Sequence, residues 1–249
     1  MTAPSTPPRT AAALIIGNEI LSGKTPESNL VVLARTLRGL GILLRRAVVV
    51  ADDMDQISRE IADLSRSHDL VFTSGGVGPT HDDVTTEAVA RAFGVDVIMS
   101  PELEALIREH YGEHCTEVHL RMALVPRGAE LLNCGGSKWP AVVMRNVWLL
   151  PGIPEVFRMK IPIIRDCLSG GQPFMSRAVY TRMDEGDLKP LLDGVVKAHP
   201  RVEVGSYPKW CDPDCLTMVT FDGRDEDAVA KAVDAFTGLL PKGEPQKIE

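Results

Sequence analysis

Short apolar runs alternate with amphipathic stretches through the first two thirds of the chain. Ala11–Ile16 is almost entirely apolar and ends at Gly17, which is typical of a strand covered by helices on both faces. Thr25 and Pro26 suit the N-cap and the first helical position of the amphipathic stretch that follows. This alternation, with its short connections, predicts an α/β fold: a three-layer, doubly wound, mainly parallel sheet with helices on both faces.

The same patterns continue to about residue 165. Apolar runs predict strands, and a capping residue or a proline before a helical stripe predicts the start of a helix. The expected strands are Leu43–Val50, Asp69–Thr73, Val95–Met99 and two short strands within Val142–Leu150 that turn near Arg145; the expected helices follow Asp52–Asp55, cover Val84–Ala92, and begin at Ser100-Pro101 and at Pro154.

A cluster of glycine and proline at residues 169–173 predicts a domain boundary. We expect an α/β domain at residues 10–168 and a second, smaller α+β domain of βαββα order at residues 174–249. Its expected strands are 178–182, 202–206 and 216–222, and its expected helices are 187–198 and 225–240. Residues 1–9 hold three prolines and predict a disordered tail.

Charge and hydropathy exclude several classes of protein. The chain has 27 Lys and Arg against 34 Asp and Glu, a formal net charge of −7, which disfavours nucleic acid as a partner. No apolar run approaches the roughly 18 residues that cross a bilayer, and the first residues lack the pattern of a signal peptide. We expect a cytoplasmic protein with no membrane partner, and its five scattered cysteines predict free thiols.

The sharpest motif is Ser74-Gly75-Gly76-Val77-Gly78-Pro79-Thr80-His81-Asp82-Asp83, between a predicted strand and a predicted helix. Ligands of open α/β sheets bind beyond the carboxyl ends of the strands, where this segment lies. Successive backbone amides in a glycine-rich bend favour phosphate, although neither standard nucleotide-binding fingerprint fits the segment. The alternative interpretation is a tight turn that caps the helix.

Two acidic residues, Asp82 and Asp83, complicate a bare phosphate site. A carboxylate about 5 Å from a phosphate charge is repelled by roughly 3 kcal/mol at an effective dielectric near 20, more than a helix dipole contributes. One hypothesis is a divalent cation such as Mg²⁺ that bridges an aspartate to the ligand. The other is that one aspartate caps the helix and the second faces solvent or an uncharged part of the ligand.

A second polar segment, Gly17–Gly23, follows the first predicted strand and is expected beside the glycine loop. Asn18 and Glu19 are candidates for ligand or metal contacts there, and Asn29 adds a polar group on the same rim. Each of these residues is equally ordinary as a turn residue or a local helix cap.

Three further patterns carry less weight. His110 and His114 fit the H-x-x-E-H spacing of a zinc site, but Gly112 between them weakens the helix such a site needs. Cys211 and Cys215 have no second pair that would complete a zinc site. Ser74 and His81 flank the glycine loop, but no third group marks them as nucleophile and base.

The chain also resembles a known family. The segments LIIGNEILSGKTPESN, VVVADD, TSGGVGPTHDDVT, LVPRGAELLN and VWLLPGIPEVF are similar to the molybdopterin-binding (MoaB/Mog-like) domain. They resemble the version at the N-terminus of competence/damage-inducible protein A (CinA) and, above all, that of FAD synthases, which also carries a small α+β module. The match spans about Ala11–Arg165, and its motifs arrive in the family's order.

The resemblance implies roles for individual residues. The ligand loop would be Gly75, Gly76, Val77, Gly78, Pro79 and Thr80; the opposite rim would be Asn18, Glu19 and Asn29, with a backbone wall ending at Gly152; and Asp82, Asp83 and Glu19 would serve catalysis or a divalent metal. The family's Gly-Asp-Glu becomes Gly17-Asn18-Glu19 here, which removes one carboxylate, and the family's glycine-rich wall becomes residues 135–140.

Three hypotheses of function follow. The first is a protein that binds a pterin or nucleotide phosphate and hydrolyses a dinucleotide pyrophosphate such as ADP-ribose or FAD with a divalent metal. The second is a non-catalytic molybdopterin-binding or carrier protein of molybdenum cofactor metabolism. The third is a scaffold that acts through its sheet edge, and in each case a closed homo-oligomer is the expected assembly. No nicotinamide-nucleotide amidohydrolase or FAD-synthesising activity is expected, because neither of those domains is present in the sequence.

Overall fold

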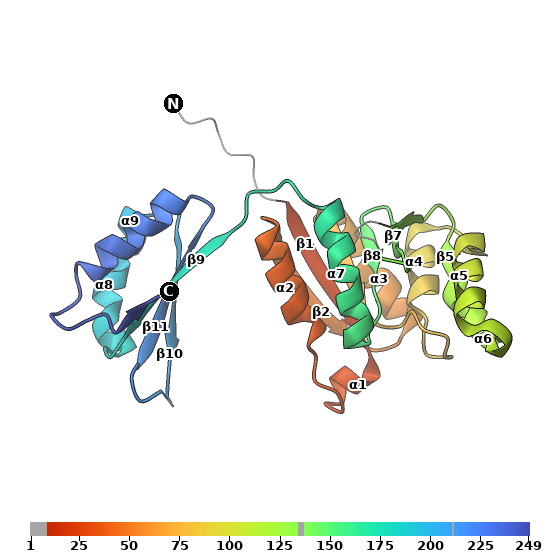
Figure 1. Ribbon diagram of the computed structural model, residues 1–249, viewed down its shortest axis with the longest axis horizontal. Helices are drawn as coiled ribbons and strands as arrows, with labels where there is room; N and C mark the ends of the chain where they lie inside the picture. Colours follow the sequence, from red (N-terminus) through yellow and green to blue (C-terminus); the bar gives the residue numbers. More distant parts are fainter. Residues whose placement is uncertain (1–8, 134–136, 211) are drawn as a thin grey trace. The chain divides into compact units, whose positions relative to one another are not determined.

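The computed structural model describes residues 9–133, 137–210 and 212–249. The chain divides into two compact units, Met1–Gly171 and Gln172–Glu249, and each has its own sheet and core (Figure 1). The tail expected at residues 1–9 lies, apart from Arg9, outside the described residues.

The sheet of the first unit has six strands in the order β2-β1-β3-β8-β7-β6. The pairings from β2 to β8 are parallel, and β7 and β6 are antiparallel to their neighbours. The strands are β1 (Thr10–Ile16), β2 (Leu43–Val50), β3 (Leu70–Ser74), β6 (Glu130–Leu132), β7 (Ala141–Met144) and β8 (Val147–Leu149). This mostly parallel sheet confirms the predicted α/β fold.

Helices cover both faces of this sheet. Alternate residues of β1 enter two separate cores: Ala13 and Ile15 pack with α2 and α7, whereas Leu14 and Ile16 pack with α3 and α4. The helices are α1 (Asn18–Leu21), α2 (Asn29–Gly39), α3 (Met54–Ser67), α4 (Thr85–Phe93), α5 (Pro101–Tyr111), α6 (Glu117–Leu120) and α7 (Pro154–Cys167), with short 3₁₀ turns at Gly112–His114 and Arg121–Ala123. The result is the three-layer arrangement expected from the sequence.

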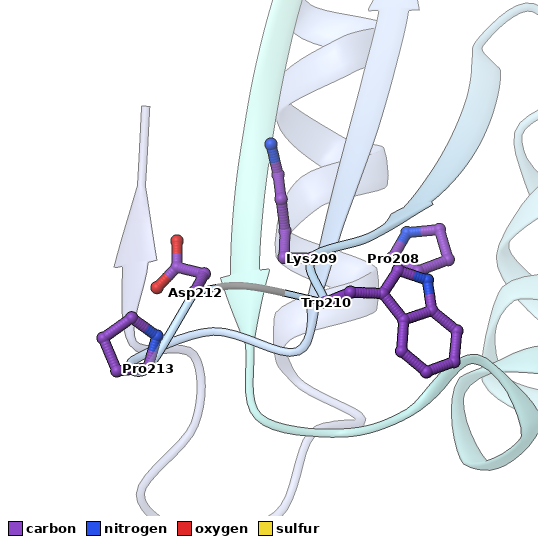
Figure 2. Close-up of a pocket in the computed structure, with 5 residues that line it drawn as sticks. All are labelled: Pro208, Lys209, Trp210, Asp212 and Pro213. Atoms are coloured by element: carbon purple, nitrogen blue, oxygen red, sulfur yellow. The ribbon is translucent and has the colours of Figure 1, made fainter.

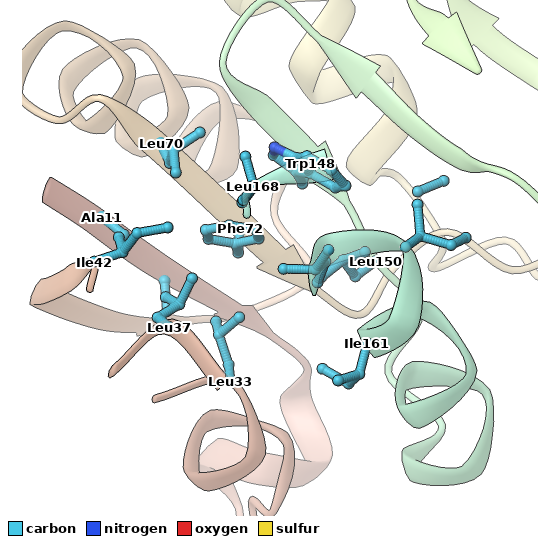
Figure 3. Close-up of a cluster of buried hydrophobic side chains, with 14 of the residues drawn as sticks. Ala11, Leu33, Leu37, Ile42, Leu70, Phe72, Trp148, Leu150, Ile161 and Leu168 are labelled. Atoms are coloured by element: carbon cyan, nitrogen blue, oxygen red, sulfur yellow. The ribbon is translucent and has the colours of Figure 1, made fainter. Parts of the chain in front are cut away.

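The core beneath α2 and α7 holds the central strands in place. Leu33 and Leu37 of α2 and Ile161 of α7 surround Phe72 of β3 (Figure 3). Burying a side chain of this kind stabilises the fold by roughly 1.5–3 kcal/mol. The strand ends that carry the candidate site are therefore anchored by packing on both sides of the sheet.

The start of α2 differs from the sequence prediction. Its N-cap is Ser28, not Thr25, and the exposed Thr25 and Pro26 lie in the loop before it. The Glu27 carboxylate accepts the backbone N–H groups of Asn29 at 3.0 Å and of Leu30 at 3.0 and 3.1 Å. This carboxylate satisfies the first amides of the helix, which is why the helix begins three residues later than the Thr-Pro signal suggests.

The strand expected at Val95–Met99 is shorter and lies outside the main sheet. Its residues form β4 (Val97–Met99), which pairs antiparallel with β5 (Leu124–Pro126) as a separate two-stranded sheet. A small core beneath α5 and α6, which includes Leu103, Ile107 and Leu120, packs against this pair. The sequence pattern identified a strand but could not identify its partner, and it missed β5 and β6, which have three residues each.

The second unit has an antiparallel sheet in the order β10-β11-β9-β12. Its elements follow the predicted βαββα order and add one more strand: β9 (Met175–Thr181), α8 (Glu185–Ala198), β10 (Glu203–Pro208), β11 (Thr217–Gly223), α9 (Glu226–Thr237) and β12 (Lys247–Ile248). Asp184 and Asp225 cap the two helices. The two-residue β12 was not predicted, because two residues carry no detectable alternation.

Candidate functional site

The candidate site of the first unit lies where β1, β3 and β8 end side by side. Gly75 directly follows β3, and its N–H donates to the Leu150 carbonyl, just beyond β8, at 3.1 Å. A Cβ added to Gly75 would lie 2.2 Å from the Ile16 carbonyl oxygen of β1, and one added to Gly152 would lie 3.2 Å from the Gly75 Cα. The glycine loop therefore lies against both neighbouring strand ends, as the order of the sheet requires.

Two glycines are required by the backbone of this loop. Gly75 has φ 110° and Gly76 has φ 67°, conformations that side chains of L residues rarely adopt. A Cβ on Gly76 would also lie 2.2 Å from the Thr85 hydroxyl oxygen. Buried Thr85 fastens the bend to α4, because its hydroxyl donates to the Gly75 carbonyl at 2.9 Å and its N–H to the Gly76 carbonyl at 2.9 Å. Sequence reasoning did not single out Thr85.

Three consecutive backbone amides of the loop lack a partner. In the part of the chain that the structure describes, no atom accepts the N–H of Gly76, Val77 or Gly78. The next residue, Pro79, has no N–H, and the Thr80 N–H donates to the Asp83 carboxylate at 2.8 Å. Gly76, Val77 and Gly78 are each partly exposed. Unpaired amides in a glycine-rich bend are the donors that an anion-binding nest uses.

The two aspartates have different surroundings. Asp83 accepts both the N–H and the hydroxyl of Thr80 and so closes the turn. The N-cap of α4 is Val84, without a side-chain bond, so the interpretation of one aspartate as the helix cap is wrong. Thr80 engages the Asp83 carboxylate earlier in the loop and keeps it from the helix amides. Asp82 is exposed, and hydrogen bonding from Thr80 and then from its own backbone lowers the pKa of its carboxyl.

The Asn29 side chain connects three segments of the candidate site by hydrogen bonds. It is buried, and its side-chain NH₂ donates to the Ser74 hydroxyl at 3.0 Å and to the Gly152 carbonyl at 2.8 Å. Its side-chain oxygen, Oδ1, is also buried and has no partner among the described residues. The N-terminus of α2 is thus joined to the ends of β3 and β8, and one buried acceptor remains unsatisfied at this junction.

The other rim residues are more exposed. Asn18 binds the rest of the chain through its backbone, because its N–H donates to the Asp52 carboxylate at 2.8 Å. The Glu19 carboxylate lies close to Gly17, because a Cβ added to Gly17 would be 2.6 Å from a Glu19 carboxylate oxygen. Asp52 was not among the predicted site residues, although the VVVADD segment contains it.

The carboxylates predicted to bind a metal do not form a cluster. The described residues contain no group of three or more His, Cys, Asp or Glu side chains placed to hold a metal ion, so Glu19, Asp82 and Asp83 do not form such a cluster. A divalent cation needs several oxygen ligands at once. The side chains present therefore do not fit a metal site made by the protein alone.

The weaker sequence patterns do not form sites in the described residues. α5 ends at Tyr111, so His110 and His114 do not share one helix face; His110 packs against Trp139 instead. Ser74 is buried and accepts a bond from Asn29, while His81 is almost fully exposed and pairs with Asp82, so the two do not form a nucleophile and base. Cys211 lies outside the described residues.

One buried charge was not predicted. Lys160 of α7 is nine-tenths buried, and its ammonium donates to the backbone carbonyls of Trp139 at 2.9 Å and Pro140 at 2.7 Å. Desolvation by burial lowers the pKa of Lys160 to about 8. Its position in an amphipathic helix gave no signal, because lysine side chains there usually reach solvent.

The fold and the glycine loop define a doubly wound α/β protein with a bend suited to anions at the carboxyl edge of its sheet. The chain belongs to the molybdopterin-binding domain family, whose model, "Probable molybdopterin binding domain", matches residues 12–164. A second model, "FAD synthase, middle domain", matches residues 173–248. Both matches confirm the resemblance drawn from the sequence.

Individual relatives agree with this assignment. A protein of Archaeoglobus fulgidus is 34% identical over 226 residues, which cover 90% of this chain and 95% of the relative. A "Probable FAD synthase" of Caenorhabditis elegans is 33% identical over 93% of this chain, and the chain spans about half of that relative's length. The crystal structure of CinA from Thermoplasma acidophilum, described as of unknown function, matches with a TM-score of 0.59 and 30% identity, covering 66% of this chain and 99% of that one.

Among the residues that the structure describes, no helix is both long enough and apolar enough to cross a bilayer.

Proposed function

We propose that the first unit binds the phosphate of a pterin or nucleotide ligand at the Gly75–Asp83 loop. The observation that carries this proposal is the run of three unpaired amides at Gly76, Val77 and Gly78, beyond the carboxyl end of β3. The loop is held in shape without the ligand, because Thr85, Leu150 and Asp83 use its other backbone groups. Such a preformed bend binds an anion with little ordering cost.

Asp82, the more exposed of the two aspartates, affects the electrostatics of the loop most directly. Asp82 has a lowered pKa and is ionised at neutral pH, so it repels a phosphate at the loop. The Asp83 carboxylate is held by the two Thr80 bonds within the turn. The amides therefore have to supply the attraction, and Asp82 limits how tightly a bare anion binds.

The rim supports a ligand that also carries a hydrogen-bond donor. The unpaired Oδ1 of Asn29 is an acceptor, and neither a phosphate nor a carboxylate can satisfy it. A pterin ring with N–H groups, or a ribose or ribityl hydroxyl, offers both the donor and the attached phosphate. The family match supports a pterin, and the FAD synthase relative supports a nucleotide.

A second candidate function is hydrolysis of a dinucleotide pyrophosphate such as ADP-ribose or FAD. It is supported by the exposed, ionised Asp82 beside the anion loop and by the relationship to a probable FAD synthase. Among the described residues, Glu19, Asp82 and Asp83 do not form a cluster that could hold a metal ion for this reaction. Under the first candidate the protein is a binding or carrier protein and forms no product.

The test measures binding and turnover separately. The purified protein is titrated with FAD, ADP-ribose and a pterin phosphate by calorimetry, with and without EDTA, and the same mixtures with Mg²⁺, Mn²⁺ or Co²⁺ are read by mass spectrometry. Binding without product supports the carrier. Product supports the hydrolase, and its persistence or loss in EDTA shows whether the reaction needs a metal. The absence of both binding and turnover in the wild type would contradict the proposal.

The cytoplasmic location and the closed homo-oligomer remain predictions. Cell fractionation tests the location, and light scattering tests the oligomeric state.

A further inference from the structure

The residues just before β7 lie at the same edge of the sheet as the glycine loop. β7 is antiparallel to β8, and Val142 near the start of β7 is paired with Leu149 at the end of β8. β8 runs parallel to β3, which leads into Gly75. The chain that enters β7 therefore lies beyond the carboxyl end of β8, two strand spacings or roughly 10 Å from the glycine loop.

Ser137–Pro140, which we call the entry segment, is held on one side by its own turn and by α5. The Ser137 hydroxyl donates to the Trp139 carbonyl at 3.0 Å and accepts the Trp139 N–H at 3.3 Å. The partly buried Trp139 ring packs edge-on against His110 of α5, with the ring centroids 5.5 Å apart. These contacts give the entry segment a defined shape.

Lys160 of α7 holds the entry segment on the other side. α7 begins at Pro154, directly beyond the end of β8, and Lys160 lies nearly two turns into the helix. Side chains of a helix lean toward its N-terminus, so Lys160 reaches back toward the edge of the sheet. Its ammonium there donates to the carbonyls of Trp139 at 2.9 Å and Pro140 at 2.7 Å.

A lysine is a costly residue for packing alone. Lys160 is nine-tenths buried, and within the described ranges no carboxylate lies within 4.0 Å of its ammonium. A methionine would fill a similar space without desolvating a charge. What the lysine adds is the pair of bonds to two consecutive carbonyls, which fixes the entry segment where it borders the site.

We propose that Lys160 is a positioning residue for the ligand of the first unit. By holding the entry segment, it places a wall against the ring of a ligand whose phosphate lies at the Gly76–Gly78 amides. A nucleotide or pterin phosphate is long enough to cross the end of β8 and touch this wall, whereas a bare phosphate is not. The inference rests on the phosphate site proposed for the glycine loop and makes Lys160 a determinant of ligand length.

The second unit offers a different place where a flat ring could lie. A hollow of about 560 Å³ is lined by Pro208, Lys209, Trp210, Asp212 and Pro213 (Figure 2). Trp210 is 93% exposed and projects to one side beside Pro208 in Figure 2. Because Lys209 and Asp212 carry opposite charges, this lining does not select a phosphate. Trp210→Ala therefore tests whether a ring ligand binds there instead of at the glycine loop.

Inorganic phosphate and FAD serve as the short and the long probe. Their affinities are measured by phosphorus NMR and calorimetry at pH 7, below the Lys160 pKa of about 8. Lys160→Met should weaken FAD by about 10-fold, the order expected when one or two hydrogen bonds no longer position a contact, and phosphate by less than about 3-fold. A general loss of positive charge would weaken both probes by comparable factors, so the ratio of the two changes isolates positioning.

Two control variants should change each affinity by less than about 2-fold. Arg158→Met removes an exposed cation from the same helix, and Trp210→Ala removes the exposed ring of the second unit. Ser137→Ala is a milder change within the entry segment. It should weaken FAD by about 2- to 5-fold and leave phosphate unchanged.

Hydrogen exchange gives a readout that needs no substitution. In the wild type, FAD should slow amide exchange in peptides that cover residues 137–144. Inorganic phosphate should slow exchange only in peptides that cover the glycine loop. This difference reports contact of the longer ligand with the entry segment, and it stands even if Lys160→Met does not fold.

The outcomes separate this inference from the function on which it rests. If the wild type binds neither probe, both fail. If the wild type binds both, the role of Lys160 alone is overturned when folded Lys160→Met weakens the two probes equally or not at all, or when FAD leaves exchange of the entry segment unchanged. Loss of FAD binding in Trp210→Ala would place the ligand in the second unit and overturn it as well.

Discussion

The Asn29 side-chain amide donates to the Gly152 carbonyl across 2.8 Å, although the two residues are 123 positions apart. The same NH₂ group reaches the Ser74 hydroxyl at 3.0 Å. One buried side chain thus joins the N-terminus of α2 to the ends of two strands of the sheet. The rim of the candidate site is held by a neutral hydrogen-bond junction and not by an ion pair, so salt should affect its geometry little.

Replacing Asn29 should loosen this junction. Asn29→Ala removes two bonds and leaves a buried carbonyl without its donor, so we expect the free energy of unfolding to fall by about 1–3 kcal/mol. Phosphate-ligand affinity should fall as well, because the Gly152 wall is no longer fixed. Urea denaturation and calorimetric titration measure the two effects. Val31→Ala is the control, since Val31 lies on the same helix and its side chain is half exposed; equal losses in both variants would contradict the role given to Asn29.

The bend at Gly76 should not tolerate a side chain. Gly76→Ala combines a left-handed φ of 67° with a Cβ 2.2 Å from the Thr85 hydroxyl oxygen. Gly94→Ala is a matched control, because Gly94 has the same φ of 67° and open space where the Cβ would lie. Backbone strain alone costs about 1–2 kcal/mol in either variant. We expect a larger loss for Gly76→Ala, together with loss of ligand binding, in urea denaturation and ligand titration; equal losses would show that the close approach to Thr85 is unimportant.

The two aspartates should respond differently to removal of their charge. Asp83→Asn weakens the turn that Thr80 closes and should lower stability by about 1 kcal/mol. Asp82→Asn should lower stability less, because Asp82 is exposed. It should also strengthen metal-free phosphate binding several-fold, because a repulsive carboxylate is removed. If the protein hydrolyses a pyrophosphate through Asp82, turnover of the same variant should instead fall. Titration in EDTA and product analysis distinguish these outcomes, and weaker phosphate binding by Asp82→Asn in EDTA would contradict the electrostatic argument.

Lys160 should make stability depend on alkaline pH. Its pKa is about 8 in the folded protein and near 10.5 in an unfolded chain, so between these values the unfolded state binds more protons. Stability therefore rises with pH through that window, by up to about 3 kcal/mol from this group. Lys160→Met should remove the rise, and exposed Lys197→Met should retain it. Urea midpoints from pH 7.5 to 10.5 measure the slope; a wild type and Lys160→Met with parallel slopes would refute the assignment.

Most of the fold was predictable because its signals are local. A few consecutive residues are enough to predict a buried strand such as Ala11–Ile16, or the start of α7 at its proline. The sequence did not predict strand pairing or helix capping where these depend on distant residues, nor did it predict very short strands. Val97–Met99 pairs with Leu124–Pro126 instead of joining the main sheet, and Glu27 replaces Thr25 as the carrier of the first capping bonds of α2.

The candidate site divides in the same way. The glycine loop and its position after a strand were visible in the sequence, and so was the acidic pair beside it. The different burial of the two aspartates was not visible, because it depends on how the loop folds around Thr80. Thr85, Lys160 and the contacts of Asn29 also depend on neighbours far along the chain.

The alternation of strands and helices, the family, and an amide-rich bend after the third predicted strand could all be predicted from the order of the residues. Hydrophobic period and turn chemistry act over a few residues, so they can be read in order along the chain. Contacts between residues far apart in the chain establish which loop amides stay unpaired and which aspartate faces solvent. Hydrogen bonding and burial depend on groups that come into contact only in the folded chain, so a local sequence pattern does not predict them.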